Sequence, residues 1–173
     1  MKVITGKIRM NYPNIFIPKK LEESEDKRYS LSILIPKSDI DTISKINEAI
    51  FSAKEKGLNI WSEIDDEIKT PLRDGDIEKS DNEAYKNHYF LNATSKYKPG
   101  IVDKSLNEIK DPDKIYPGCY GRVSLNFYPY YKENICGIGC SVNNVQKICD
   151  GQVISQSRAE DDFTIIEDDD ILS

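Results

Sequence analysis

One stretch, residues 121–130, constrains the fold most, because its side chains alternate between apolar and polar along its whole length. The apolar set is Val123, Leu125 and Phe127. The polar set that alternates with it is Arg122, Ser124, Asn126, Tyr128 and Tyr130. Successive side chains of a strand point to opposite faces, so the pattern predicts a strand with one face in a core and the other face open.

The open face of this strand carries groups that suit a nucleic acid. Aromatic rings can stack on unpaired bases, a guanidinium can contact a phosphate, and amides and hydroxyls can bond to base edges. Tyrosine is also common in ordinary half-buried strands, where it packs beside its neighbours. The alternation alone leaves both interpretations open.

The rest of the chain predicts a mainly β domain with one strong helix. Further strands are expected at 3–10, 29–35, 88–95 and around 138–142, where apolar residues alternate. Residues 11–28 are expected to form a loop rich in proline, lysine and glutamate. Gly137 and Gly139 on one face of the last strand favour the curvature of a barrel. Residues 58–87 lack periodicity and are expected to form a long functional or loosely ordered loop.

The helix is expected to begin after Ser38 or Asp39 and to end near Gly57. Its apolar residues recur at helical spacing, and all of them are expected to contact the core. They are Ile40, Ile43, Ile46, Ile50 and Phe51.

Length and composition fit one domain, expected over residues 1–159, followed by an acidic tail over 160–173. No apolar run approaches the length of a membrane span, and we expect a cytoplasmic protein with reduced cysteines. Cys136 and Cys140 lie in a predicted strand, where four residues span roughly 13 Å, too far for two ligands of one zinc ion. With His88 as the only histidine, no metal site and no cofactor are expected.

The net charge of −6 argues against a polyanionic partner, but the charges are unevenly distributed. Residues 160–173 hold seven acids and no basic residue, so the rest of the chain carries +1. Such a tail can merely solubilise the chain, compete with nucleic acid for basic surface, or bind another protein. The residues expected to contact a partner are Phe163, Asp168, Asp169, Asp170, Ile171 and Leu172.

Lys96, Tyr97 and Lys98 follow a predicted strand and place two cations around an aromatic ring. Together with Arg73 and Arg122, this triplet has the composition of a single-strand binding surface. An ordinary solvated turn would have the same composition, because lysine is mostly exposed in any case.

Carboxylates in the 58–87 stretch raise an alternative function, a two-metal nuclease. Asp74 and Asp76 flank Gly75, and Asp65, Asp66 and Glu67 lie nearby. We expect a turn instead, with carboxylates that diverge rather than converge on one ion.

Six segments of the chain, taken together and in order, resemble the bacteriophage and prophage single-stranded-DNA-binding family. They are YSLSILIPKSD (29–39), KTPLRDGD (69–76), KYKPGIVD (96–103), YPGCYGR (116–122), VNNVQK (142–147) and SRAEDDF (157–163). The resemblance implies an oligonucleotide/oligosaccharide-binding (OB) fold, here a five-stranded barrel with one packed helix. It also implies sequence-independent binding of single-stranded DNA in phage replication or recombination, without enzyme activity.

By this resemblance, the expected DNA-binding residues are Arg73, Lys96, Tyr97, Lys98, Tyr120, Arg122, Asn126 and Tyr128. Residues 59–67 depart from the family pattern, because they are acidic where a loop rich in glycine and lysine is usual. No DNA role is therefore expected for Trp61. The tail resembles those that recruit replication or recombination proteins, and self-association is left open. A protein-interaction adaptor that ignores DNA is the remaining alternative.

Overall fold

The structure is a computed structural model and describes residues 1–20, 26–61, 67–154 and 162–166. In chain order, its elements are β1 (Lys2–Ile4), β2 (Ile8–Lys20), β3 (Lys27–Pro36), α1 (Ile40–Gly57), β4 (Arg73–Asp74), α2 (Gly75–Glu78), η1 (Glu83–Tyr85), β5 (His88–Ser95), β6 (Gly100–Val102), η2 (Pro112–Lys114), β7 (Tyr120–Lys132) and β8 (Ile135–Cys149).

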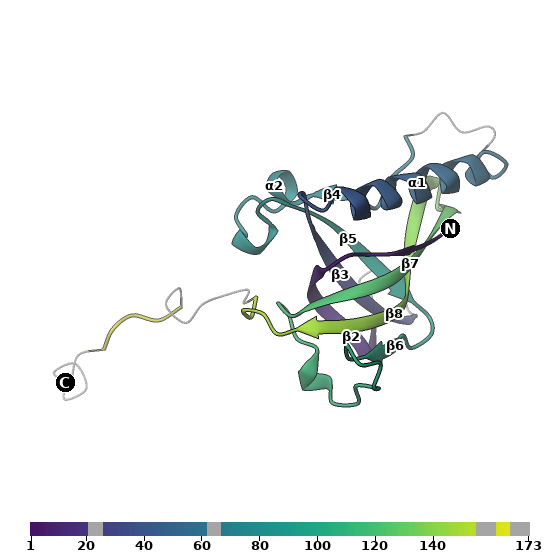
Figure 1. The fold of residues 1–173 in the computed structure, drawn as a ribbon. Helices are drawn as coiled ribbons and strands as arrows, with labels where there is room; N and C mark the ends of the chain where they lie inside the picture. Colours follow the sequence, from purple (N-terminus) through teal and green to yellow (C-terminus); the bar gives the residue numbers. More distant parts are fainter. Residues whose placement is uncertain (21–25, 62–66, 155–161, 167–173) are drawn as a thin grey trace.

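Five of the strands close into a barrel in the order β7–β2–β3–β5–β8, with β8 pairing back to β7. Every pairing in the ring is antiparallel except that of β5 with β8, which meet in parallel at Thr94 and Ser141. β1 pairs with β7 and β6 with β8, while α1 packs across the barrel mainly against β7 (Figure 1). This is the mainly β barrel with one packed helix that the sequence predicts.

The alternation in β7 is present as predicted. Val123, Leu125 and Phe127 are buried in the core, while Arg122 and Asn126 are exposed on the outer face. β3 and β5 follow the same rule, with odd-numbered residues such as Ile33 pointing inward. The barrel interior is therefore apolar, and most of the outer face of β7 is polar.

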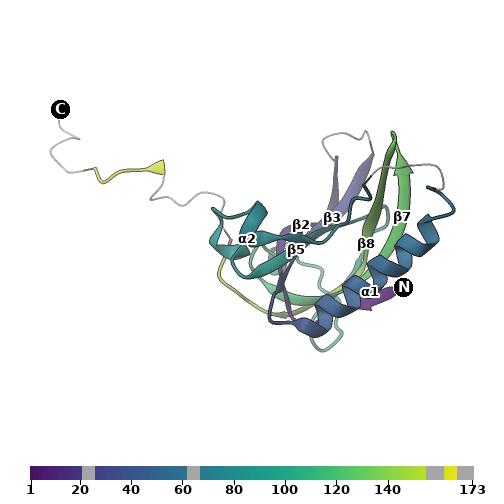
Figure 2. The same ribbon diagram turned by 90° about the horizontal axis from the view of Figure 1, so that it is seen from above.

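Two predicted boundaries are wrong. Residues 3–10 form two strands instead of one, and the predicted loop at 11–28 is largely strand. The sequence misled because prolines rarely occur within a sheet. Here Pro13 and Pro18 lie where the β2–β3 register shifts, so their missing N–H groups cost no ladder bond. The β2–β3 and β7–β8 hairpins project from the same side of the barrel (Figure 2).

α1 begins as predicted, with the Asp39 carboxylate accepting a hydrogen bond from the Thr42 N–H. It ends at Gly57 for a reason that the sequence does not reveal. A side chain there would overlap the ring of Trp61, which is buried and donates a hydrogen bond to the carbonyl of Tyr130. The ring therefore packs against the bare backbone of the last helical turn.

The predicted core stripe of α1 is partly wrong. Ile46 and Ile50 are buried and Ile43 is half-buried, but Ile40 and Phe51 are 75% and 64% exposed. The buried face is completed by small residues, Thr42, Ala49 and Ala53. Ile40 and Phe51 lie outside this buried face of the helix, so their side chains remain on the outer surface.

The described part of the long 58–87 segment is ordered by side-chain caps. Asp74 caps α2 and Asn82 caps η1, each through a side-chain oxygen that accepts a backbone N–H. Tyr85 is buried and packs edge-on against Phe90 on the outer face of β5. This segment covers one end of that face with a small second cluster of apolar residues.

None of the helices in the described ranges is both long and apolar enough to cross a bilayer. Burial raises the pKa of the Cys119 and Cys140 thiols. Over the same ranges, no three His, Cys, Asp or Glu side chains are grouped as a metal ion would require.

Candidate nucleic-acid interface

Tyr128 lies on the outer face of β7, directly opposite Gly139 of β8. A Cβ atom at Gly139 would lie only 2.5 to 2.7 Å from two ring carbons and the hydroxyl oxygen of Tyr128, so the ring lies across the glycine. Tyr130 lies over Gly137 in the same way. Tyr128 remains 40% exposed, and partial burial raises the pKa of its phenol. A neutral ring with an outer face open to solvent can stack on a base.

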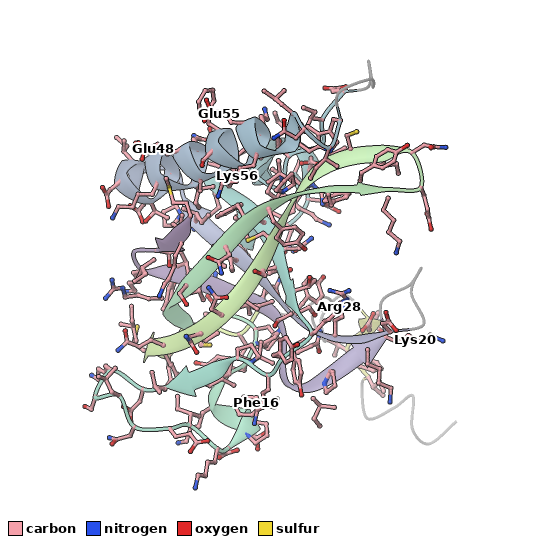
Figure 3. All side chains as sticks on the ribbon, turned by 90° about the vertical axis from the view of Figure 1, so that its right-hand side faces the viewer. Phe16, Lys20, Arg28, Glu48, Glu55 and Lys56 are labelled. Carbon is pink, nitrogen blue, oxygen red and sulfur yellow. The ribbon has the colours of Figure 1, made fainter. Side chains whose placement is uncertain are left out.

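Arg28, which the sequence analysis did not select, lies near this ring and acts on it through its charge. It belongs to β3 at the projecting end of the β2–β3 hairpin, where it pairs directly with Lys19, and Lys20 pairs with Lys27 (Figure 3). Like charges directly opposite each other on a sheet destabilise it. An anionic partner at this hairpin would remove that cost.

Between the two hairpins, β3, β5 and β8 present small polar side chains outward. Ser30 pairs with Thr94, which in turn pairs with Ser141. Ser32 donates a hydrogen bond to the Asn92 amide oxygen at 2.6 Å. We call this surface the β3–β5 face. Its small side chains leave room for a polymer to lie across it.

The triplet after β5 borders the β3–β5 face. Lys96, Tyr97 and Lys98 are exposed, and Tyr97 is 82% exposed. The Lys98 ammonium lies 5.4 Å from the centre of the Phe16 ring on β2 (Figure 3). Neither Lys96 nor Arg28 forms a salt bridge with any residue that the structure describes, so both charges are available to a phosphate.

Arg73 lies at the far end of β5, where it pairs with Phe90, six residues or roughly 20 Å along the strand from Lys96. Its guanidinium donates three hydrogen bonds of 2.8 to 3.1 Å to the Glu78 carboxylate. It also lies 4.9 Å from the centre of the Phe90 ring. The charge of Arg73 is therefore already paired within the protein.

The other predicted residues of β7 have contacts of their own within the protein. The Tyr120 ring has the Lys7 ammonium 4.7 Å and the Arg9 guanidinium 5.6 Å from its centre, so cations occupy its surroundings. Arg122 donates to the carbonyl of Thr5. The side-chain amide of Asn126 donates to that of Asn143. Asn126 lies two residues from Tyr128 on the same outer face of β7 and pairs with Ser141 of the β3–β5 face, whereas Tyr120 and Arg122 lie nearer the start of the strand.

The carboxylates considered for a nuclease hold a lysine instead. Contrary to the prediction that they diverge, Asp74 and Asp76 converge, each with an oxygen 2.8 Å from the Lys37 ammonium. This contact is the main cause that lowers the pKa of Asp76. Asp65 and Asp66 lie outside the described residues. The position between Asp74 and Asp76 is therefore already filled by a cation.

Most of the residues predicted to form the tail's binding site lie outside the described residues, namely Asp168, Asp169, Asp170, Ile171 and Leu172. Phe163 is described and is 75% exposed. The ring of Trp61 is buried in the core and cannot stack on a base.

The strand order shows which surface of other barrels the β3–β5 face corresponds to. In OB-fold barrels, oligonucleotides bind the face of the second and third barrel strands together with the loops that join strands one to two and four to five. Counting barrel strands along this chain gives β2, β3, β5, β7 and β8. The corresponding surface is the β3–β5 face with the β2–β3 and β7–β8 hairpins.

Comparison with known proteins identifies relatives of the whole chain. A family model described as "Enterobacter phage Enc34, ssDNA-binding protein" matches residues 1–172. Protein p50 of Acyrthosiphon pisum secondary endosymbiont phage 1 is 27% identical over 186 residues, covering 100% of both chains.

Two similar solved structures share the fold. The single-stranded DNA-binding protein of bacteriophage Enc34, in complex with ssDNA, has a TM-score of 0.72 at 19% identity and matches 89% of each chain. The gp2.5 single-stranded DNA-binding protein of bacteriophage T7 has a TM-score of 0.68 at 13% identity. That match covers 93% of this chain and 92% of gp2.5.

Proposed function

Because this chain belongs to the family of the Enterobacter phage Enc34 ssDNA-binding protein, we propose that it binds single-stranded DNA during phage replication or recombination in the host cytoplasm. The binding is independent of sequence, because stacking and phosphate contacts do not read base edges. The chain acts by binding alone, and its acidic tail recruits replication or recombination proteins.

One observation carries the location of the site: the open ring of Tyr128 lies over Gly139 on the outer face of β7 and feels the positive charge of Arg28. A strand that crosses the β3–β5 face stacks a base on this ring. Its phosphates meet Arg28 and the Lys19, Lys20 and Lys27 cations of one hairpin, and Lys96 and Lys98 beyond the end of β5.

Some of the residues predicted to bind DNA belong to the proposed site, and others do not. Lys96, Tyr97, Lys98 and Tyr128 border one surface and form the proposed site. Arg73 is paired to Glu78, and Tyr120 has cations beside its ring, so we assign both a structural role. Asn126 borders the same surface, because it pairs with Ser141, whereas Arg122 lies nearer the start of β7 and outside the proposed site.

A titration of fluorescent dT and duplex oligonucleotides of equal length tests this function. We expect anisotropy to rise with dT at low salt, and the affinity to fall steeply between about 50 and 200 mM salt because bound phosphates release counterions. Equal affinity for the duplex would contradict preference for single strands. Adding Mg²⁺ and following oligonucleotide length on a gel separates binding from cleavage, and shortened DNA would contradict a pure binder.

A further inference from the structure

Tyr12 in β2 has a backbone conformation that bulky residues rarely adopt. Its φ is 44°, and among the non-glycine residues with positive φ that the structure describes, only Tyr12 lies inside a strand. It lies in a β-bulge, because Asn11 and Asn14 are three residues apart while their partners on β3 are two residues apart. A left-handed position in a bulge usually holds glycine. Pro13 adds to the strain, because a residue that precedes proline favours an extended backbone.

A chain of buried contacts holds Tyr12 in this conformation. The side-chain oxygen of Asn11 accepts the Tyr12 N–H at 3.0 Å, and the side-chain nitrogen of Asn11 donates to the Tyr85 hydroxyl at 2.9 Å. Asn11 and Tyr85 are both buried, and Tyr85 packs edge-on against Phe90. Rotating the Asn11 amide would leave buried polar groups unpaired, so the backbone of Tyr12 is fixed. Strained residues that their surroundings hold so firmly are concentrated at functional sites.

The bulge places Tyr12 at the β2 border of the β3–β5 face. Asn11 pairs with Ser32, and the Asn14 amide donates to the Ser30 hydroxyl at 3.3 Å, so both serines of that face adjoin the bulge. Tyr12 is 46% exposed and belongs to neither apolar cluster of the described residues. Core packing therefore does not account for a tyrosine at this position.

We propose that Tyr12 is a second stacking platform, which binds a base of single-stranded DNA at the opposite border of the β3–β5 face from Tyr128. The inference rests on the proposed function, because it adds a second base position to the same surface. It explains why the bulge holds an aromatic residue where glycine would be less strained. A ring stacks on any base, so the second position is also independent of sequence.

The two rings are too far apart to hold the same base. In the barrel order β7–β2–β3–β5–β8, the path from Tyr12 on β2 to Tyr128 on β7 across this face passes β3, β5 and β8. Four strand spacings amount to roughly 19 Å of sheet. A strand of DNA that contacts both rings must therefore cross the whole face, over the small polar side chains of β3 and β5.

Tyr12→Gly tests the platform, because it removes the ring and introduces a residue that adopts a positive φ without strain. We expect this variant to bind a dT oligonucleotide of about 16 nucleotides roughly 5- to 150-fold more weakly than the wild type, the loss of one stack. Its urea midpoint should be no lower than that of the wild type. Tyr12→Phe keeps the ring and should bind nearly as the wild type.

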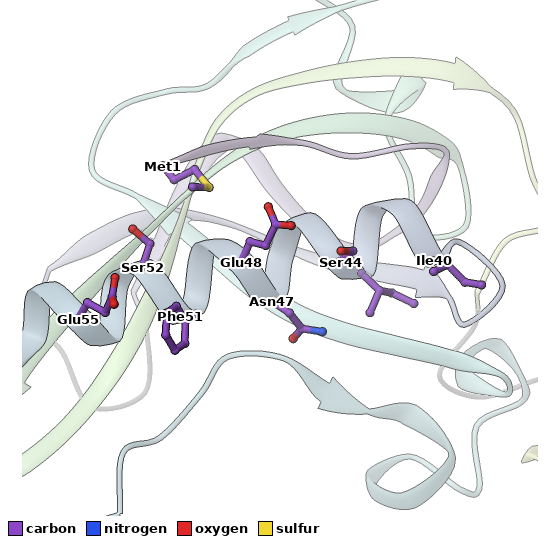
Figure 4. Close-up of a pocket in the computed structure, with 9 residues that line it drawn as sticks. Met1, Ile40, Ser44, Asn47, Glu48, Phe51, Ser52 and Glu55 are labelled. Atoms are coloured by element: carbon purple, nitrogen blue, oxygen red, sulfur yellow. The ribbon is translucent and has the colours of Figure 1, made fainter.

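Phe51→Ala is the matched control for the loss of an exposed aromatic ring. Phe51 is 64% exposed but projects from α1, outside the β3–β5 face (Figure 4). This variant should bind dT as tightly as the wild type. A loss as large as that of Tyr12→Gly would show that the effect is not specific to the bulge, and would overturn the proposal.

Oligonucleotide length separates the second base position from the first. In anisotropy titrations with dT of about 4 to 16 nucleotides, wild type and Tyr12→Gly should bind the shortest oligonucleotides alike and differ increasingly as length grows. Equal affinities at every length would overturn this inference but not the proposed function, whereas a wild type that binds no dT would overturn both. An equal loss at every length would contradict a separate position, and a lower urea midpoint for Tyr12→Gly would overturn the argument from strain.

Discussion

At the scale of single residues, the glycines of β8 matter because of what lies above them. Gly137 and Gly139 have no side chain where the rings of Tyr130 and Tyr128 lie across the sheet. Aromatic residues opposite glycine stabilise a strand pair, since the ring covers backbone that glycine leaves exposed. The same arrangement turns one face of the Tyr128 ring toward solvent, so packing and binding use opposite faces of one ring.

We expect Tyr128→Ala to weaken binding of dT oligonucleotides by roughly 5- to 150-fold, the loss of one base–aromatic stack. Tyr128→Phe keeps the ring and should bind nearly as wild type. Tyr131→Ala is a control, because Tyr131 is 46% exposed but its side chain leaves β7 on the face opposite to that of Tyr128, and its hydroxyl donates to Asn134. Fluorescence anisotropy at one salt concentration measures all three, and an unchanged affinity for Tyr128→Ala would remove this ring from the site.

At the scale of elements, a three-residue ion cluster fastens α2 to the end of β3. Lys37 follows β3, while Asp74 and Asp76 cap and begin α2, and Asp76 also accepts the Asn87 N–H. The Lys37 contact and this N–H lower the pKa of Asp76 from 3.8. A carboxylate with a lowered folded-state pKa stabilises the fold above its unfolded pKa, and this contribution disappears as the pH falls through the folded value.

We therefore expect acid to weaken the wild-type fold more than an Asp76→Asn variant, between about pH 5 and pH 2. Urea midpoints at neutral and acid pH measure this difference. Asp81→Asn, in the same segment and also exposed, is the control and should follow the wild type. If Asp76→Asn and wild type lost the same stability in acid, the cluster would contribute nothing to the fold.

In the β2–β3 hairpin, positively charged side chains lie directly opposite one another, which lowers the stability of the free hairpin. Lys20 faces Lys27 and Lys19 faces Arg28, so each pair repels in the free protein. We expect the double variant Lys20→Gln/Lys27→Gln to be slightly more stable to urea but to bind dT oligonucleotides less tightly. The slope of log affinity against log salt should fall by about 0.7 for each phosphate that the variant no longer neutralises. A variant that binds as wild type would exclude the hairpin from the site.

At the scale of the whole molecule, the distribution of charge decides how an acidic protein can bind a polyanion. The full chain carries −6, but without the seven acids of residues 160–173 the rest carries +1. A chain-borne polyanion close to a basic surface competes with DNA through the same electrostatic interaction.

Deleting residues 160–173 is therefore expected to tighten binding of dT oligonucleotides, most strongly at low salt, where screening is least. Anisotropy titrations of the full and shortened chains at two salt concentrations measure the effect. A second form with the same length, in which the seven acids are replaced by Asn and Gln, separates charge from length. Unchanged affinity in both would show that the tail does not compete with DNA.

The sequence by itself determined the local features of this protein. Period-two alternation in 121–130 identified the buried face of β7, because successive strand residues must point to opposite sides. Asp39 identified the start of α1, and the resemblance is the source of the predictions for Lys96, Tyr97, Lys98 and Tyr128. These features depend on neighbours in the chain, so the order of residues is enough to predict them.

Only the tertiary structure decided which residues meet. The charge of Arg28 acts on Tyr128 because two hairpins far apart in sequence project from the same side of the barrel. Arg73 is left out of the proposed site because Glu78 and Phe90 hold its guanidinium, and Phe51 is exposed because the barrel buries another face of α1. Periodicity fixes the direction of a side chain relative to its own element, whereas pairing and exposure depend on how elements pack against one another.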